Sequence, residues 1–171
     1  MLGKLPCEPI RISVILLQKK ITMEQPEITI YNIADTNNKI DLMRKSIQLL
    51  LPNKDLGFVV AHMISTFIDG LAKAPKHDAG ATYKQYLKDN FPELCRFIDP
   101  DLFYENLRNK AIHEFAPLPP LAIARASSFG NSAMYAETRK IEGKEWICLN
   151  VDILTEDFLR HLDIIETDNE I

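Results

Sequence analysis

The sequence lacks several features that would place it in a well-defined structural class. Only three cysteines (Cys7, Cys95 and Cys148) occur in 171 residues, and they are far apart, without a CxxC pair or the Cys/His spacing of a zinc site. We therefore expect free thiols, a reducing compartment and a cytoplasmic protein. The absence of internal repeats and of low-complexity segments argues against a solenoid or an array.

A long apolar run is also absent. No uninterrupted stretch reaches the roughly 18 apolar residues of a transmembrane helix, so no membrane span is predicted. Residues 1–22 contain ISVILL, which is too short for a signal peptide and is followed by QKK instead of small residues. Since Met23 begins MEQPEITIYNI like a natural start, we interpret residues 1–22 as an N-terminal extension. The alternative, a genuine first strand IRISVILL, stays open.

Positive charge is scarce in the chain as a whole. The formal net charge is −4, and residues 151–171 carry seven acidic side chains against one basic side chain. Residues 1–20 have the opposite balance, with four basic side chains and one acidic one. A broad basic surface for nonspecific binding of nucleic acid is therefore not predicted, although a local basic groove is compatible with the sequence. The acidic segment is interpreted as a solvated amphipathic helix with a frayed end.

What the sequence does contain is an ordinary globular composition with strong helical patterning. Hydrophobic residues make up 46% and charged residues 26%, which suits one domain, assigned to residues 23–171. The clearest pattern runs from Leu56 to Leu71, where apolar residues recur at helical spacing. Prolines and turn residues separate the patterned segments. Helices are predicted over residues 36–51, 54–74, 81–91 and 100–115.

The composition changes after the fourth predicted helix. AMYAETRK and EWICLNVDI alternate on either side of IEGK, which predicts a β-hairpin over about residues 131–152. Trp146 is expected to pack this hairpin onto the helices, with a binding anchor as the alternative. Thr155 is predicted to cap a short terminal helix over about residues 155–165. The predicted fold class is mainly α, with a four-helix core over about residues 36–116, a small C-terminal β-hairpin and a short terminal helix.

The fourth predicted helix carries the chemistry. Each residue advances about 100° around a helix axis, so residues four apart form a line. One line is apolar and is expected to face the core: Phe103, Leu107, Ala111 and Phe115. A polar line lies roughly opposite: Asp101, Glu105, Asn109 and His113. Arg108 lies between the two lines, near enough to His113 to share a bound phosphate, and Asn109 is one turn away from the histidine ring.

The other histidines carry weaker signals. His62 and Asp69 are seven residues apart on the polar face of the second predicted helix, and with His113 they could suggest a metal site. No third ligand is fixed by the sequence, so a solvated face is favoured and no metal or other cofactor is predicted. His77, in a turn, and His161, in the acidic terminal helix, are interpreted as surface residues.

Arg108, Asn109 and His113, within LRNKAIHEF, resemble the signature of HEPN domains. That family consists of helical bundles with an arginine, often followed by a polar residue, and a histidine a few positions later on a late helix; four residues separate the two here. The resemblance covers about residues 36–116. It implies a HEPN-like four-helix bundle, with the hairpin and the acidic terminal segment outside the family pattern.

The resemblance also implies a function. Many HEPN domains are metal-independent ribonucleases in defence, toxin–antitoxin systems or RNA processing, and they usually form dimers with both motifs at the interface. Carried over, His113 is the acid/base group, Arg108 the phosphate clamp and Asn109 the orienting polar residue. Imidazole titrates near neutral pH, and a guanidinium presents planar paired donors to a phosphoryl group, so both residue types suit this chemistry.

Two features of the chain depart from the active family pattern. Phe115 stands where some toxin members have a tyrosine that a partner nucleotidyltransferase modifies, so an antitoxin of that kind is not favoured. Glu105 and Glu114 also lie near Arg108, which gives RNA a mixed electrostatic field. Two alternatives stay open beside a homodimeric ribonuclease: a non-catalytic HEPN-like nucleotide-binding or protein-interaction module, and an unrelated helical dimerisation protein.

Overall fold

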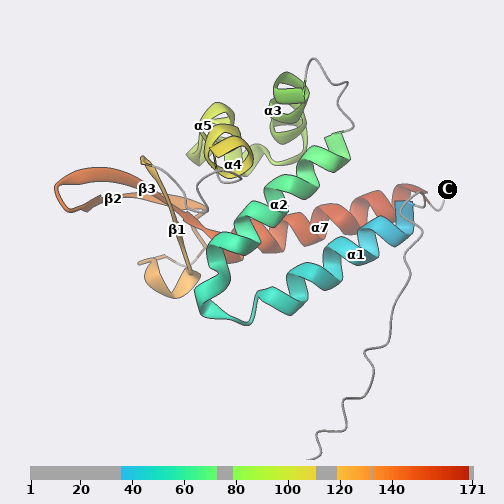
Figure 1. Cartoon of the computed structure of the whole chain (residues 1–171), viewed down its shortest axis with the longest axis horizontal. Helices are drawn as coiled ribbons and strands as arrows, with labels where there is room; N and C mark the ends of the chain where they lie inside the picture. The colour runs from blue at the N-terminus through green and yellow to red at the C-terminus, as the bar shows by residue number, and fades with distance from the viewer. Residues whose placement is uncertain (1–35, 73–78, 111–118, 132, 170–171) are drawn as a thin grey trace, which may run out of the picture. The chain divides into compact units, whose positions relative to one another are not determined.

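The computed structural model describes residues 36–72, 79–110, 119–131 and 133–169. All of them belong to one compact unit, residues 31–171. These ranges contain six α-helices and a small three-stranded sheet (Figure 1). The predicted mainly α class with a small β component is therefore confirmed. The HEPN-type four-helix arrangement stays a prediction, as does the assignment of residues 1–22, which lie outside the described residues.

The first two predicted helices form where the apolar pattern places them. Helix α1 spans Thr36–Leu50 and helix α2 spans Gly57–Ala72. Between them, Asn53 Oδ1 accepts a hydrogen bond from the Asp55 backbone N–H (3.0 Å) and caps the short 3-10 turn η1, Lys54–Leu56. The apolar stripes of both helices are buried in one core: Ile40, Ile47, Val60, Ile64 and Ile68.

Helix α2 lies at the centre of the packing. It contacts α1, α3 (Ala79–Asn90), α7 (Val151–Asn169), strand β1 (Leu121–Ala124) and the helical turn η2 (Glu105–Lys110). Figure 1 shows α2 crossing the middle of the described residues. Among those residues, the segment Lys54–Ala72 is long and apolar enough to cross a membrane by length and composition. One third of that segment is buried against neighbouring elements, and a helix that packs into a core has the same length and composition.

The third predicted helix is confirmed as α3, Ala79–Asn90, and a helix that was not predicted follows it. Pro92 does not simply end α3; it begins α4, Pro92–Phe97, where proline suits the first turn because its missing N–H would have no helical partner. Phe91, between the two helices, is fully buried and stacks on Phe158 with ring centroids 6.4 Å apart.

The predicted hairpin is present, but it belongs to a larger sheet. Strands β2, Ala136–Ile141, and β3, Lys144–Asn150, pair antiparallel, and positive φ angles at Glu142 and Gly143 fit a two-residue hairpin turn. A third strand, β1, Leu121–Ala124, pairs parallel with β3, which gives the order β1-β3-β2. The prediction of a two-stranded appendage was wrong, because LAIA is too short for an alternating pattern to stand out.

The terminal helix is longer and more deeply packed than predicted. Helix α7 spans Val151–Asn169 and begins directly after β3. Asn150, not Thr155, caps it: Asn150 Oδ1 accepts from the Asp152 backbone N–H at 3.2 Å, whereas the Thr155 hydroxyl donates to the Val151 carbonyl inside the helix (2.7 Å). Its apolar face is part of the core and is fully buried: Leu154, Phe158 and Leu162.

His161 also differs from its prediction as a surface residue. It is 8% exposed, its Nε2 lies 2.6 Å from the Tyr86 hydroxyl, and the Phe91 ring packs against it edge to face. Burial lowers the pKa of the imidazole and raises the pKa of Tyr86 to about 12. Both shifts favour the neutral forms, and the histidine tautomer decides which of the two groups donates the hydrogen bond. His77 lies outside the described residues.

Candidate functional site at a π-helical turn

The helix that carries the motif is not a regular α-helix. Asp99 caps α5, Pro100–Tyr104, by accepting a hydrogen bond from the Asp101 backbone N–H (2.7 Å). From Glu105 to Lys110 the chain continues as a π-helix, η2. A π-helix bonds each carbonyl five residues ahead and therefore rotates side chains relative to an α-helix. Such turns are rare and often occur at functional sites.

The apolar line of the predicted helix faces the core as far as the structure describes it. Phe103 and Leu107 are both fully buried. Residues 111–118 lie outside the described residues, so Ala111, His113 and Phe115 are not placed. The wider π turn also buries Asn106, which is 2% exposed. Its Nδ2 donates to the Leu102 carbonyl (3.1 Å), while its buried Oδ1 has no hydrogen-bond partner among the residues that the structure describes.

Arg108 points toward α2 and forms an ion pair there. Its Nε donates to Asp69 Oδ2 at 2.8 Å, and the two side chains are 27% and 23% exposed. Within the described residues, Arg108 makes no hydrogen bond through either Nη atom. The interpretation of Asp69 as part of a merely solvated face was therefore wrong. The spacing of His62 and Asp69 identified the correct face of α2 but gave no sign of what packs against it.

His62 contacts the residue immediately before Arg108. Its Nδ1 lies 2.8 Å from the Leu107 carbonyl oxygen, and its ring stacks on Phe58. Because a carbonyl can only accept, Nδ1 carries the hydrogen of this bond. His62 is therefore occupied in joining α2 to the π turn. Among the described residues, no group of three or more His, Cys, Asp or Glu side chains is arranged to hold a metal ion.

Ser65 completes a polar row along the face of α2 that meets α3 and η2. Its hydroxyl lies 2.6 Å from the Tyr83 hydroxyl, and both side chains are fully buried. Burial raises the pKa of Tyr83 far above its usual value, so this hydroxyl stays protonated. We call these three residues the α2 polar row: His62, Ser65 and Asp69. Each binds a different partner, so the row holds α3 and the π turn in fixed positions relative to α2.

The polar line of the predicted fourth helix makes other contacts than Arg108, which meets α2. Asn109 Nδ2 donates to Glu105 Oε1 at 3.2 Å, and Lys84 pairs with Asp101. Asp101, Glu105 and Asn106 line a hollow of about 470 Å³ together with Pro119 and Pro120. Arg108 does not line this hollow. Of the predicted site residues, Arg108 and Asn109 therefore face different partners, and the position of His113 relative to them is outside the described residues.

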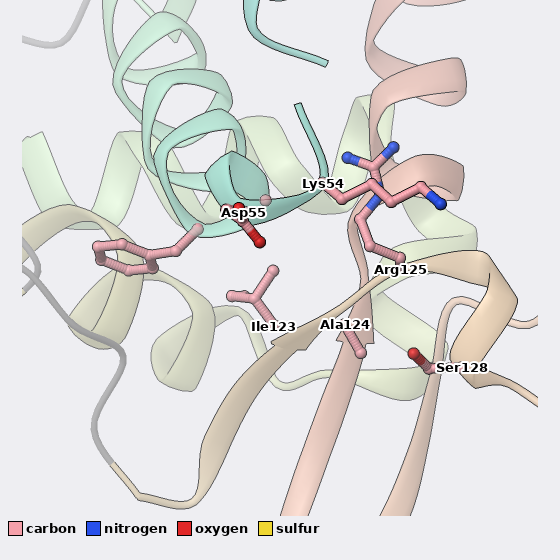
Figure 2. A pocket seen from close by; sticks show the side chains of 8 residues that line it. Lys54, Asp55, Ile123, Ala124, Arg125 and Ser128 are labelled. Carbon is pink, nitrogen blue, oxygen red and sulfur yellow. The ribbon is translucent and has the colours of Figure 1, made fainter. Parts of the chain in front are cut away.

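A second hollow, of about 430 Å³, lies where α2 begins beside β1 (Figure 2). Lys54, Asp55, Ile123, Ala124, Arg125 and Ser128 are among its lining residues. The Arg125 guanidinium is already committed, because it pairs with Asp152 (2.7 Å) and donates to the Leu51 carbonyl (3.1 Å). This arginine, which directly follows β1, joins the strand end to α7 and to Leu51, just after α1.

Comparison with known proteins adds no family assignment: no family model, no curated protein and no solved structure matches the chain. The likeness to HEPN domains therefore stands on Arg108, Asn109 and His113 within LRNKAIHEF, together with the helical character of the residues that precede them.

Proposed function

We propose that the chain is a HEPN-like, metal-independent endoribonuclease that acts as a homodimer. The observation that carries the proposal is the setting of Arg108. It lies in a π-helical turn five residues before His113, and a single bond to Asp69 leaves both of its Nη groups available within the described residues. A guanidinium held in this way suits the recognition of a phosphate through two parallel N–H donors.

In the proposed reaction, the ribose 2′-OH attacks the adjacent phosphorus. A base takes the 2′-OH proton, an acid protonates the departing 5′-oxygen, and the products are a 2′,3′-cyclic phosphate and a 5′-OH end. Arg108 stabilises the negative charge that grows on the phosphoryl oxygens. His113 has the residue chemistry to act as acid or base near neutral pH. A twofold dimer supplies two copies of His113 and hence both roles.

The experiment that tests the proposal is cleavage of a mixed RNA pool by the full chain in EDTA, beside the variants Arg108→Ala and His113→Ala. We expect wild-type cleavage with cyclic phosphate ends, loss of cleavage in both variants, and a dimer by light scattering. Cleavage that persists in both variants would refute the assigned roles. A strictly monomeric protein at high concentration would refute the dimer.

A non-catalytic HEPN-like module is the second candidate, and one observation favours it. Asn109 bonds Glu105, and the carboxylates of Asp101 and Glu105 line the hollow beside the motif helix. This setting disfavours a long polyanion. A confirmed dimer that binds mononucleotides or a protein partner but cleaves no RNA would support this candidate over the ribonuclease.

A further inference from the structure

Asp69 and Arg108 are 39 positions apart in sequence but form one of the less exposed ion pairs of the described residues. The contact joins Asp69 Oδ2 to Arg108 Nε at 2.8 Å, and each side chain keeps only about a quarter of its surface exposed. Such a contact is less screened by solvent than a pair on the open surface. It therefore restricts where the guanidinium can lie.

The geometry of the contact leaves part of the guanidinium free. A guanidinium has five N–H donors in one plane, and the carboxylate of Asp69 engages the single donor on Nε. Arg108 makes no hydrogen bond through its two Nη groups in the described part of the chain. These groups form the outer edge of the plane, which is the edge that can bind two phosphate oxygens.

The helix that holds Asp69 is itself fixed against the motif helix. His62, two turns earlier on α2, bonds the Leu107 carbonyl at 2.8 Å, and Ser65 bonds the buried hydroxyl of Tyr83 at 2.6 Å. Two anchors therefore precede the Asp69 contact along the same face of α2. An arginine side chain loses rotamer entropy when it is ordered, so a carboxylate on a fixed helix removes part of that cost before a ligand binds.

We propose that Asp69 is a positioning residue that orients the Arg108 guanidinium, so that its Nη edge receives the scissile phosphate of RNA. This inference rests on the proposed ribonuclease function and deepens it. Asp69 touches neither RNA nor the reacting atoms; it acts through Arg108. A displacement of about 1 Å in a group that stabilises the transition state can lower a rate by about 100-fold. The main effect of losing Asp69 is therefore on kcat.

The test is a double-mutant cycle between Asp69→Asn and Arg108→Ala in the full chain, measured by RNA cleavage in EDTA. Asp69→Asn is expected to lower kcat by about 10- to 100-fold, with a much smaller change in KM, and to cost nothing further in the Arg108→Ala background. Asp69→Glu, which keeps a carboxylate, is expected to recover part of the rate. Where Arg108→Ala leaves no measurable rate, the same cycle is measured with Arg108→Lys, which keeps the positive charge but lacks the paired Nη donors.

The matched control is Asp163→Asn. It makes the same charge change and removes the contact between Asp163 and Arg44 (2.7 Å) on α7 and α1. This variant is expected to retain the wild-type rate. Equal rates for wild type, Asp69→Asn and Asp163→Asn would overturn the inference, and so would an equal loss from Asp69→Asn in both backgrounds.

A readout without RNA separates this inference from the proposed function. The Nε–H group of Arg108 gives an NMR signal that Arg108→Lys identifies by its disappearance. We expect Asp69→Asn, but not Asp163→Asn, to shift or broaden that signal. An unchanged signal overturns the inference whatever the activity. In another outcome, the signal shifts in Asp69→Asn while the wild-type protein neither cleaves nor binds RNA. That result overturns the proposed function and the catalytic part of the inference. The contact between Asp69 and Arg108 is then a structural one.

Discussion

Replacing Leu107 by alanine is the most direct test of the π-helical turn as a packed element. Leu107 is fully buried, and its carbonyl is held by His62 on α2, so the surrounding residues have little freedom to collapse into the space left behind. Leu→Ala changes in cores cost about 2–5 kcal/mol, and we expect about 3 kcal/mol here. For a chain of this length that loss corresponds to a fall in Tm of roughly 6–12 °C.

The assay is urea unfolding followed by circular dichroism, with the change in the free energy of unfolding taken from the midpoint at constant slope. Leu49→Ala is the matched control, because Leu49 on α1 is 79% exposed and its truncation is expected to change the free energy by at most about 0.5 kcal/mol. A Leu107→Ala variant that loses less than about 1 kcal/mol, or no more than Leu49→Ala, would refute the reasoning that this turn is firmly packed.

Three further predictions concern the polar groups of the core. Ser65→Ala leaves the buried Tyr83 hydroxyl without its partner and should cost about 1–3 kcal/mol by urea unfolding, whereas adding Tyr83→Phe should restore most of the loss. His161 has a folded-state pKa below its unfolded value of about 6.5, so the unfolded chain binds more protons. The free energy of unfolding should therefore fall as pH drops below about 6.5, and a His161→Gln variant that keeps the same slope would contradict this. Asn150→Ala removes the cap of α7 and a bond to the Met134 carbonyl and should lower thermal stability by about 1–2 kcal/mol; an unchanged Tm would show that neither contact matters.

The sequence predicted the elements whose signals are local. The stripe from Val60 to Ile68 specifies α2 because its apolar residues recur on the face that becomes buried, and the helix predicted from residue 100 begins there as α5. The alternation around IEGK likewise predicted the β2–β3 hairpin, whose partners are neighbours along the chain. In these cases the pattern and the packing depend on residues a few positions apart.

The features that were missed depend on distant partners. LAIA becomes β1 only because β3 provides a parallel neighbour more than twenty residues later, and α7 is buried because its apolar face meets α1 and α2. No composition signal marks the π turn at Glu105–Lys110, because this turn depends on its packing against α2. The ion pair of Arg108 with Asp69 follows from the same packing. The sequence could assign each residue to a face of its own helix, but it could not predict that the two faces meet.

The burial of α7 bears on how the chain folds during synthesis. Arg44 on α1 meets Asp163 across 119 positions, and the aromatic ring of Phe158 on α7 packs on rings from earlier elements. The apolar faces of α1 and α2 therefore leave the ribosome long before the helix that covers them. Long-range contacts of this kind slow folding, and uncovered apolar faces are sites of aggregation and chaperone binding. Truncation before Val151 should accordingly give an insoluble product and not a smaller folded domain.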